Sequence, residues 1–363
     1  MMKHVGHPFK HGLRLALSLA VLLATVAPLP ADRDDCDIAA AVTGEAAYDH
    51  VAFLSEVIGA RVTGTAEERR AAAYIREQLD DMDYKVRVQP FSFTTSAGET
   101  IASANIVAVK PGRRNRTVIV GAHYDSVSYR ACDDGNFLTG AGDNASGVGV
   151  MLEVAEILEE YPSRGRIIFV AFGGEEKGLW GARHFADQMS DKDVEHTVAM
   201  INLDSVGAGD FFYVYAGLDD NPGWVRDQAL DIGARLGYDL RTSPESEWFV
   251  RGTTGDWSDH VPFRLLGIPI AYFEWMNWDI EPDGGIETAA YGWIMHTCRD
   301  NLYFTSQDKL EKTADVVATL VHELGNQRIS KPDRQRERAR LGTAAAAVKA
   351  FQVQVQKRKG RPD

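Results

Sequence analysis

Histidines and acidic residues follow the ends of several short apolar segments in this chain of 363 residues. The residues placed in this way are His123, Asp125, Glu175, Glu176 and Asp204. A further acid, Asp143, lies in a glycine-rich stretch ahead of a helical pattern. If the apolar segments are strands of one open α/β sheet, their carboxyl ends border a single crevice, and these side chains converge there. Carboxylates gathered in this way need cations to balance their charge.

The residue types favour zinc among the divalent cations. Imidazole and carboxylate groups without a cluster of thiolates are typical of zinc sites. With His123 and His296 as the nitrogen ligands, each of two metal ions takes one histidine and one carboxylate, and one more acid bridges them. The pattern therefore predicts a hydrolytic centre that holds two Zn²⁺ ions.

The segments that carry these residues alternate between two patterns. Continuously apolar runs, typical of strands buried on both faces, occur at 117–121, 166–172, 198–203, 211–216 and 268–273. Helical patterns occur at 148–160, 181–189, 222–236 and 308–327. This alternation predicts an α/β fold.

The stretch ahead of these segments predicts a helix and a sheet edge. Thr65 and Glu68 have the spacing of a capping box and begin a helix that ends near Met82. The alternating segments 84–94 and 101–109 predict two adjacent antiparallel strands. We expect a doubly wound, mostly parallel mixed sheet flanked by helices, in one domain.

The N-terminal segment has the pattern of an export signal. Basic residues precede an apolar run at 15–27, and small residues up to Ala31 provide a cleavage site. A membrane anchor is the alternative, but the run of about 13 residues is shorter than the roughly 20 needed to span a bilayer. We expect residues 1–31 to be a signal peptide cleaved near Ala31, a periplasmic or secreted protein, and no stable membrane span after cleavage.

The charge distribution separates a basic tail from an acidic body. The formal net charge is −13, from 39 basic and 52 acidic residues. Residues 331–363 are basic, so the body at 32–330 is more acidic than the whole chain and repels phosphate backbones. We therefore expect no nucleic-acid partner. The tail is either a solvated appendage or a surface that binds a partner.

Three cysteines allow at most one disulfide bond in an oxidising compartment. Cys298 lies next to His296 in the predicted metal site. The favoured pair is therefore Cys36 with Cys132, although the sequence leaves the other pairings open.

Six motifs, in this order, resemble the di-zinc aminopeptidase family. They are GAHYDS (121–126), GDNASG (142–147), FGGEEKGL (172–179), NLD (202–204), SDHVPF (258–263) and HTCRD (296–300). The family includes the bacterial leucyl aminopeptidases and has glutamate carboxypeptidases and glutaminyl cyclases as relatives. The resemblance covers roughly residues 45 to 325 and implies the zinc-dependent exopeptidase fold.

The resemblance also implies a role for each site residue. The terminal zinc ligands are His123, Glu176, Asp204 and His296, and Asp143 bridges the two ions. Glu175 is the general base, because a carboxylate beside a ligand can take the proton of a metal-bridging water without coordinating metal itself.

Two further acids have expected supporting roles. Asp125 lies two residues after His123, close enough to accept the second N–H of its imidazole and orient the ring. Asp300 has a similar expected role toward His296.

Other readings of the same motifs stay open. Asp143 is also placed to be only a helix N-cap. Ser258, Asp259 and His260 have the residue types of a nucleophilic triad, but without a serine elbow we interpret the segment as one that orders a loop. Met295 stands where some relatives carry a tyrosine that polarises the scissile carbonyl, so the oxyanion donor is undecided.

The sequence predicts an exported metallo-exopeptidase, most simply an aminopeptidase acting on peptides with a free N-terminus. The acidic body suits a cationic α-amine. A carboxypeptidase is the first alternative and needs an arginine at the crevice, such as Arg251 or Arg299. The others are a glutaminyl cyclase, which uses one zinc ion, and a catalytically silent binding protein, which the presence of Glu175 disfavours.

Overall fold

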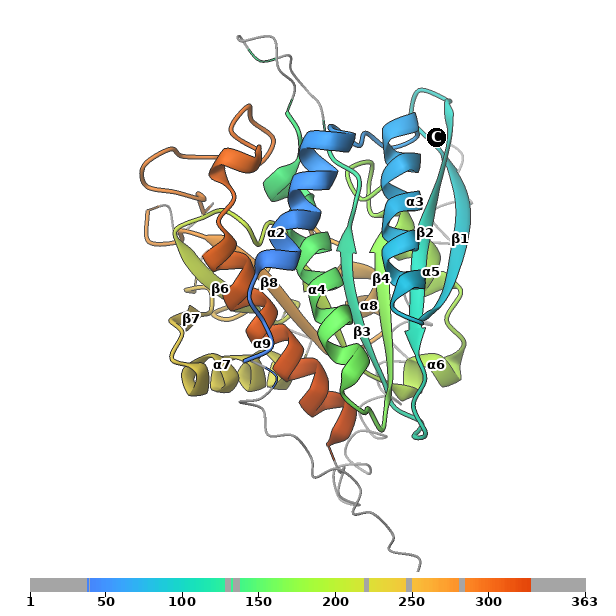
Figure 1. Ribbon diagram of the computed structural model, residues 1–363, viewed down its shortest axis with the longest axis vertical. Coiled ribbons are helices and arrows are strands. Elements are labelled where there is room, and N and C mark those ends of the chain that lie inside the picture. Colours follow the sequence, from blue (N-terminus) through green and yellow to red (C-terminus); the bar gives the residue numbers. More distant parts are fainter. Residues whose placement is uncertain are drawn as a thin grey trace, which may run out of the picture. The chain divides into compact units, whose positions relative to one another are not determined.

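Eight strands form one mixed sheet in the computed structural model (Figure 1), in the order β1-β2-β4-β3-β5-β8-β6-β7. The strands are β1 (Lys85–Thr94), β2 (Thr100–Lys110), β3 (Thr117–His123), β4 (Arg166–Phe172), β5 (Thr197–Leu203), β6 (Phe211–Tyr215), β7 (Leu240–Arg241) and β8 (Ile270–Met276). The structure describes residues 38, 40–127, 132, 138–218, 222–245, 250–280 and 285–327. The predicted signal peptide and basic tail lie outside these residues.

The centre of the sheet is parallel. Strand β3 pairs in parallel with β4 and β5, and β5 pairs in parallel with β8. Every residue of β3, β5 and β8 is buried, which explains why these strands have no polar face in the sequence. The predicted parallel core is confirmed.

Antiparallel strands flank the parallel centre on both sides. Strands β1 and β2 form the predicted antiparallel pair, and β2 is antiparallel to β4. At the other edge, β6 is antiparallel to β8 and pairs in parallel with the two-residue strand β7. A strand of two residues has no periodicity that a sequence could reveal.

Helices cover both faces of the sheet, as in a doubly wound fold. They are α2 (Glu45–Ala52), α3 (Ala66–Asp81), α4 (Ser146–Glu160), α5 (Trp180–Asp187), α6 (Asp191–His196), α7 (Trp224–Leu236), α8 (Val261–Leu265) and α9 (Gln307–Asn326), with irregular or tight turns η1 (Phe53–Ile58), η2 (Ala141–Ala145) and η3 (Leu302–Phe304). Helices α2, α3, α4, α7 and α9 share one apolar core, and α5, α6 and α8 pack on the opposite face (Figure 1).

Helices α3, α4, α5, α7 and α9 agree with the predicted segments, whereas α2, α6 and α8 were not predicted. Helix α3 begins as expected, because the side chain of Thr65 accepts a hydrogen bond from the backbone N–H of Glu68. Helix α2 depends on a distant residue: the Glu153 carboxylate accepts hydrogen bonds from the backbone N–H groups of Gly44 and Ala47, at 2.9 Å each. Such a cap has no local sequence pattern.

The disulfide bond differs from the favoured pairing. Cys132 is bonded to Cys298, with 5.7 Å between their Cα atoms, and not to Cys36. The loop after β3 and the loop that carries His296 meet at the same edge of the sheet. That proximity, and not the sequence separation of 166 residues, decides the pair.

None of the helices in the described ranges is both long enough and apolar enough to cross a membrane.

Candidate metal centre

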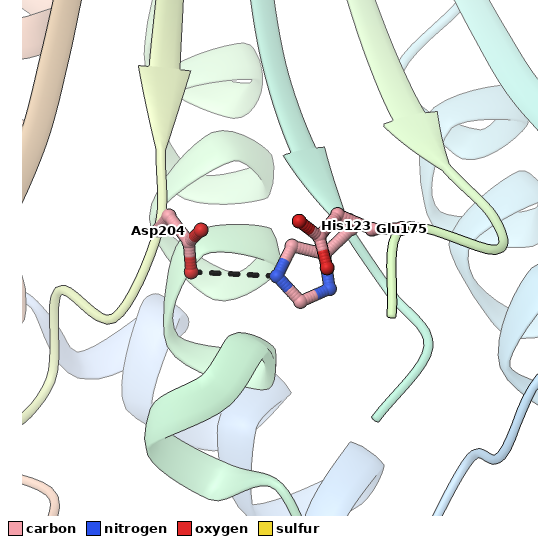
Figure 2. Close-up of side chains that lie close together, drawn as sticks. All are labelled: His123, Glu175 and Asp204. Carbon is pink, nitrogen blue, oxygen red and sulfur yellow. Dashed lines mark hydrogen bonds and ion pairs between the residues drawn. The ribbon is translucent and has the colours of Figure 1, made fainter. Parts of the chain in front are cut away.

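The predicted site residues meet at the carboxyl ends of the parallel strands. His123 is the last residue of β3, Asp204 directly follows β5, and Glu175 and Glu176 follow β4. Asp143 lies in the turn η2, ahead of α4. Figure 2 shows the side chains of His123, Glu175 and Asp204 directed toward one another from three neighbouring chain segments.

The Asp143 carboxylate lies between the two histidines. Its Oδ1 atom is 3.2 Å from Nε2 of His123, and its Oδ2 atom is 2.9 Å from Nε2 of His296. Nε2 of His123 also lies 3.3 Å from Oδ1 of Asp204, and Nε2 of His296 lies 3.4 Å from Oε2 of Glu176. Each imidazole therefore has one terminal carboxylate and shares Asp143 with the other.

These separations suit two zinc sites. Two donor atoms bound to one tetrahedral zinc ion at about 2.0–2.1 Å lie about 3.3 Å apart. The four nitrogen–oxygen distances are 2.9–3.4 Å. Ligand-capable atoms of His123, Asp143 and Glu176 lie within 4.8 Å of one another, and so do those of His123, Glu175 and Asp204. The donor set therefore fits two zinc ions that share one carboxylate.

Most of the site is buried, although the side chain of His296 is 41% exposed, and its excess of acids shifts the pKa of several groups. Burial and then the neighbouring carboxyls Asp259, Asp204 and Glu176 raise the pKa of Glu175 well above its usual range. Burial and then Asp143 raise the pKa of Glu176 to about 7. Burial without a metal ion thus disfavours the charged forms of these acids, and a divalent cation would reverse that effect.

The histidines show the complementary effect. Burial alone would lower the pKa of His123, but Glu175 and Asp204 raise it well above its usual range. Hydrogen bonds to Asp143 and Glu176 raise the pKa of His296 to about 11. In both cases the neighbouring carboxylates stabilise the positively charged form of the imidazole.

Asp125 has a different contact from the one predicted. Nδ1 of His123 is 3.1 Å from the backbone carbonyl of Asp125 and 3.8 Å from its carboxylate, so the carbonyl orients the ring. The carboxylate accepts hydrogen bonds from the backbone N–H groups of Glu175 (3.0 Å) and Glu176 (3.3 Å) and from the hydroxyl of Thr63 (2.7 Å). Asp125 thus holds both glutamates, because their N–H groups lie closer to its carboxylate than the imidazole does.

Asp300 supports a different partner from the one predicted. Its Oδ1 atom accepts hydrogen bonds from the backbone N–H groups of Gly142 (2.6 Å) and Asp143 (3.4 Å), and its Oδ2 atom is buried without a partner. Asp300 therefore braces the loop of Asp143 instead of the ring of His296. The peptide bond between Asp143 and Asn144 in this loop is cis.

The segment 258–260 orders the site, as interpreted from the sequence. The hydroxyl of Ser258 donates to Oδ2 of Asp204 at 2.7 Å and accepts from the side chain of Asn202 at 2.8 Å. His260 is fully buried, and burial lowers its pKa to about 3. Its Nε2 atom lies 3.1 Å from the carbonyl of Gly255, so it is not paired with Ser258 as a triad base would be.

Arg61 is a supporting residue that the sequence reasoning missed. Its guanidinium is fully buried and donates to the carbonyls of Tyr124 (2.8 Å), Thr139 (2.8 Å) and Gly140 (2.7 Å). It also donates to the carbonyls of Leu54 and Gly59, at 3.3 and 3.1 Å. Arg61 thereby ties the chain after His123 to the chain before Asp143. No acidic residue lies two, three or four positions from Arg61 in the sequence, so no local pattern predicted that Arg61 would be buried.

A pocket of about 270 Å³ opens beside the centre. Its apolar walls are formed by Trp257, Tyr272, Met276, Trp278, Trp293 and Met295. Met295, at the position of the tyrosine in some relatives, lines this pocket. Tyr291 is 53% exposed and packs on Phe304, and it is not among the described residues that line the pocket.

Comparisons with known proteins agree with this geometry. The model of peptidase family M28 matches residues 105–321. The chain is 34% identical over 228 residues to aminopeptidase YwaD of Bacillus subtilis (strain 168), covering 61% of this chain and 44% of that protein. It is 30% identical over 264 residues to the alkaline phosphatase isozyme conversion protein of Escherichia coli (strain K12), covering 68% and 76%. The chain thus spans less than half the length of YwaD.

Solved structures share the fold. BSAP, a zinc aminopeptidase from Bacillus subtilis, superimposes with a TM-score of 0.66 at 23% identity, covering 79% of this chain and 96% of that one. Glutaminyl cyclase of Porphyromonas gingivalis superimposes with a TM-score of 0.62 at 25% identity, covering 78% and 99%.

The doubly wound sheet and the imidazole–carboxylate donor set define the class as α/β proteins with a candidate zinc centre. With the matching family model and the second relative, the chain belongs to peptidase family M28, and the resemblance stated from its motifs is confirmed.

Proposed function

We propose that this protein is an aminopeptidase that removes N-terminal residues from peptides with the help of two zinc ions. The observation that carries the proposal is the Asp143 carboxylate, whose two oxygens face His123 and His296 at 3.2 and 2.9 Å beside an open pocket. In this proposal Asp143 would be shared by the two ions, Asp204 would complete the ligand set of His123, and Glu176 would complete that of His296. The bound zinc supplies a Lewis acid that polarises the scissile carbonyl and acidifies water.

Glu175 is the proposed general base. It lines the pocket, and its backbone N–H is held by Asp125, which fixes where its carboxylate stands. In this proposal Glu175 stands beside the metal ligand Glu176 without being a ligand itself, so it takes a proton from the attacking water and returns it to the leaving amine.

The acids around the pocket favour a substrate with a free α-amine. The described lining contains the acids Asp143, Glu175, Asp204 and Glu274, and this excess of negative charge suits a cationic N-terminus. A carboxypeptidase needs a cation at the same place, yet Arg251 and Arg299 are exposed, and no arginine is found among the described residues of the lining. The aminopeptidase is therefore the better supported of the two.

Export is part of the proposal. The basic residues and apolar run at 15–27 support it, and the Cys132–Cys298 disulfide suits an oxidising compartment.

The test uses the two adjacent glutamates as a matched pair. We expect nearly two zinc ions per chain in the purified protein and turnover of aminoacyl p-nitroanilides. Glu175→Gln should keep its zinc and lose about 10²–10⁴-fold in kcat, because only the base is removed. Glu176→Gln should instead bind zinc more weakly, because a ligand is removed.

Several results would contradict the proposal. Full activity of Glu175→Gln would exclude it as the base. One zinc ion per chain, with cyclisation of N-terminal glutamine and no release of amino acids, would replace the aminopeptidase with a glutaminyl cyclase. Two zinc ions without turnover of any free or blocked peptide would favour a silent binding protein.

A further inference from the structure

A carboxyl group lies deep in the wall of the candidate substrate pocket. Glu274 lines the pocket together with Tyr272 and Met276, its alternate neighbours on the same face of β8. Leu203 of β5 pairs with Phe273, so Glu274 stands one residue beyond the pair, next to the strand end that carries Asp204. Glu274 is 2% exposed, whereas Trp257 and Trp293 in the same lining are 46% and 41% exposed. The acid is therefore at the inner end and the two tryptophans are at the mouth.

The Glu274 carboxylate accepts hydrogen bonds from two tyrosine hydroxyls. The hydroxyl of Tyr215 donates to Oε1 at 2.7 Å, and the hydroxyl of Tyr272 donates to Oε2 at 2.9 Å. The indole N–H of Trp278 donates to the oxygen of Tyr215 at 2.7 Å, which leaves the tyrosine hydroxyl hydrogen for Glu274. Every donor of this chain of bonds is oriented to stabilise a negative charge on Glu274.

Burial raises the pKa of Glu274 to about 7 against the effect of the two tyrosine hydrogen bonds, and the nearby acids Asp204 and Glu287 raise it further. Among the described residues, no cation is found in an ion pair with Glu274, so a bound cation would stabilise its charged form. His260 stacks on Tyr272 with ring centroids 5.1 Å apart, but burial lowers the pKa of His260 to about 3, so this ring is neutral. A carboxylate has about four acceptor positions, and the two tyrosines occupy two of them. The remaining positions are open to a ligand.

The rest of the pocket suits a long side chain with a charged end. The indole and thioether groups of Trp278, Met276 and Met295 pack against methylene groups, and aromatic faces also attract cations. The cavity of about 270 Å³ has the volume of about nine water molecules at roughly 30 Å³ each, enough for one large side chain.

We propose that Glu274 makes this pocket selective for a basic N-terminal residue, arginine or lysine, whose cationic end pairs with the buried carboxylate. The inference rests on the proposed aminopeptidase function, because it assigns the pocket to the side chain of the residue that is released. The apolar walls hold the methylene stem, and Glu274 provides the countercharge at the inner end.

The test compares arginine with citrulline, which has nearly the same shape and no charge. For the wild-type protein with zinc, we expect kcat/KM for the arginine p-nitroanilide to exceed that for the citrulline p-nitroanilide by about 10- to 100-fold, the range of a charge-assisted hydrogen bond. In Glu274→Gln, which keeps the shape and removes the charge, this ratio should fall to about one. Glu153→Gln, a buried glutamate that caps α2 far from the pocket, should leave the ratio unchanged.

The outcomes separate this inference from the function on which it rests. An arginine-to-citrulline ratio near one in the wild-type protein overturns it. The inference is also overturned if Glu274→Gln lowers kcat/KM equally for the arginine and citrulline substrates, because Glu274 would then act on a group that both share, such as the α-amine. If Glu274→Gln does not fold, the wild-type protein alone tests the inference. Preference for the arginine substrate, together with stronger inhibition by arginine amide than by citrulline amide, supports it, and equal values refute it.

If zinc is bound and no anilide is hydrolysed, the aminopeptidase proposal fails. Calorimetric binding of the two amides to the zinc-loaded protein then tests the pocket alone. Binding of arginine amide at least about 10-fold tighter supports the role of Glu274, and equal binding refutes it.

Discussion

Replacement of Arg61 by methionine should weaken both the fold and the metal centre. Arg61 is fully buried and donates five hydrogen bonds, all to backbone carbonyls. Burial lowers its pKa to about 10, against the opposing effect of Asp300, Asp125, Asp143 and Glu176, so it remains charged at neutral pH. Methionine has a similar length and supplies neither the donors nor the charge.

The expected loss follows from these contacts. Leaving one buried acceptor without a donor costs about 1–3 kcal/mol, and removing one partner from a group of buried charges costs about 3–5 kcal/mol. Water that enters the space will restore some of the hydrogen bonds. We expect the free energy of unfolding to fall by about 4 kcal/mol and the zinc affinity to fall by about 10- to 100-fold. The affinity falls because the Thr139 and Gly140 carbonyls position Asp143.

Two assays measure these effects. Urea unfolding with saturating zinc gives the free energy, and competition with a chromogenic chelator gives the zinc affinity. Arg166→Met is the matched control. Arg166 is 37% exposed and bonded to Thr117 and Asp193, so its loss should cost no more than about 1 kcal/mol and leave zinc binding unchanged. Arg61→Lys should fall between wild type and Arg61→Met, because lysine keeps the charge and has fewer donors.

The reasoning is refuted if Arg61→Met unfolds within about 1 kcal/mol of wild type and binds zinc equally well. Loss of stability with unchanged zinc affinity would limit Arg61 to a role in the fold.

Two further predictions concern stability. Cys298→Ser should lower the free energy of unfolding by about 3–5 kcal/mol, because the Cys132–Cys298 bond closes a loop across 166 residues. Wild-type protein in reductant should have the same unfolding midpoint as the variant. A wild-type midpoint that reductant leaves unchanged would contradict the expectation. Stability should also fall by about 3 kcal/mol between pH 6.5 and pH 4 through His50. Burial lowers the pKa of this residue from 6.5 to about 4, despite the opposing effect of Asp49, so in this range the unfolded chain binds a proton that the folded chain does not. His50→Gln should remove that part of the pH dependence in urea unfolding, and equal slopes for the two proteins would disprove it.

The sequence by itself determined the parallel core and the position of the site. Residues of β3, β5 and β8 are buried on both faces, and this requirement leaves a continuous apolar run that is readable without a structure. The carboxyl ends of such strands meet at one edge, so His123 and Asp204 could be placed together before any distance was known. Helix α3 was predictable because its cap, Thr65, bonds to a residue three positions away.

The tertiary structure alone decided which partner each polar group chose. Asp125 holds the loop of Glu175, and Asp300 holds the loop of Asp143, although sequence spacing had suggested the histidines. The start of α2 depends on Glu153, more than 100 residues away. Such contacts depend on distances through space, which no local pattern encodes.

The same limit applies to the disulfide, to Arg61 and to Glu274. Cys132 joins Cys298 because two loops meet at one edge of the sheet, and Arg61 is needed because five carbonyls converge on one buried point. Glu274 directly follows the predicted apolar segment 268–273, and the sequence reasoning did not select it. Only the packing of β8 against the tryptophans makes it the inner end of a pocket. Periodicity records whether a residue is buried, and the fold decides what it is buried against.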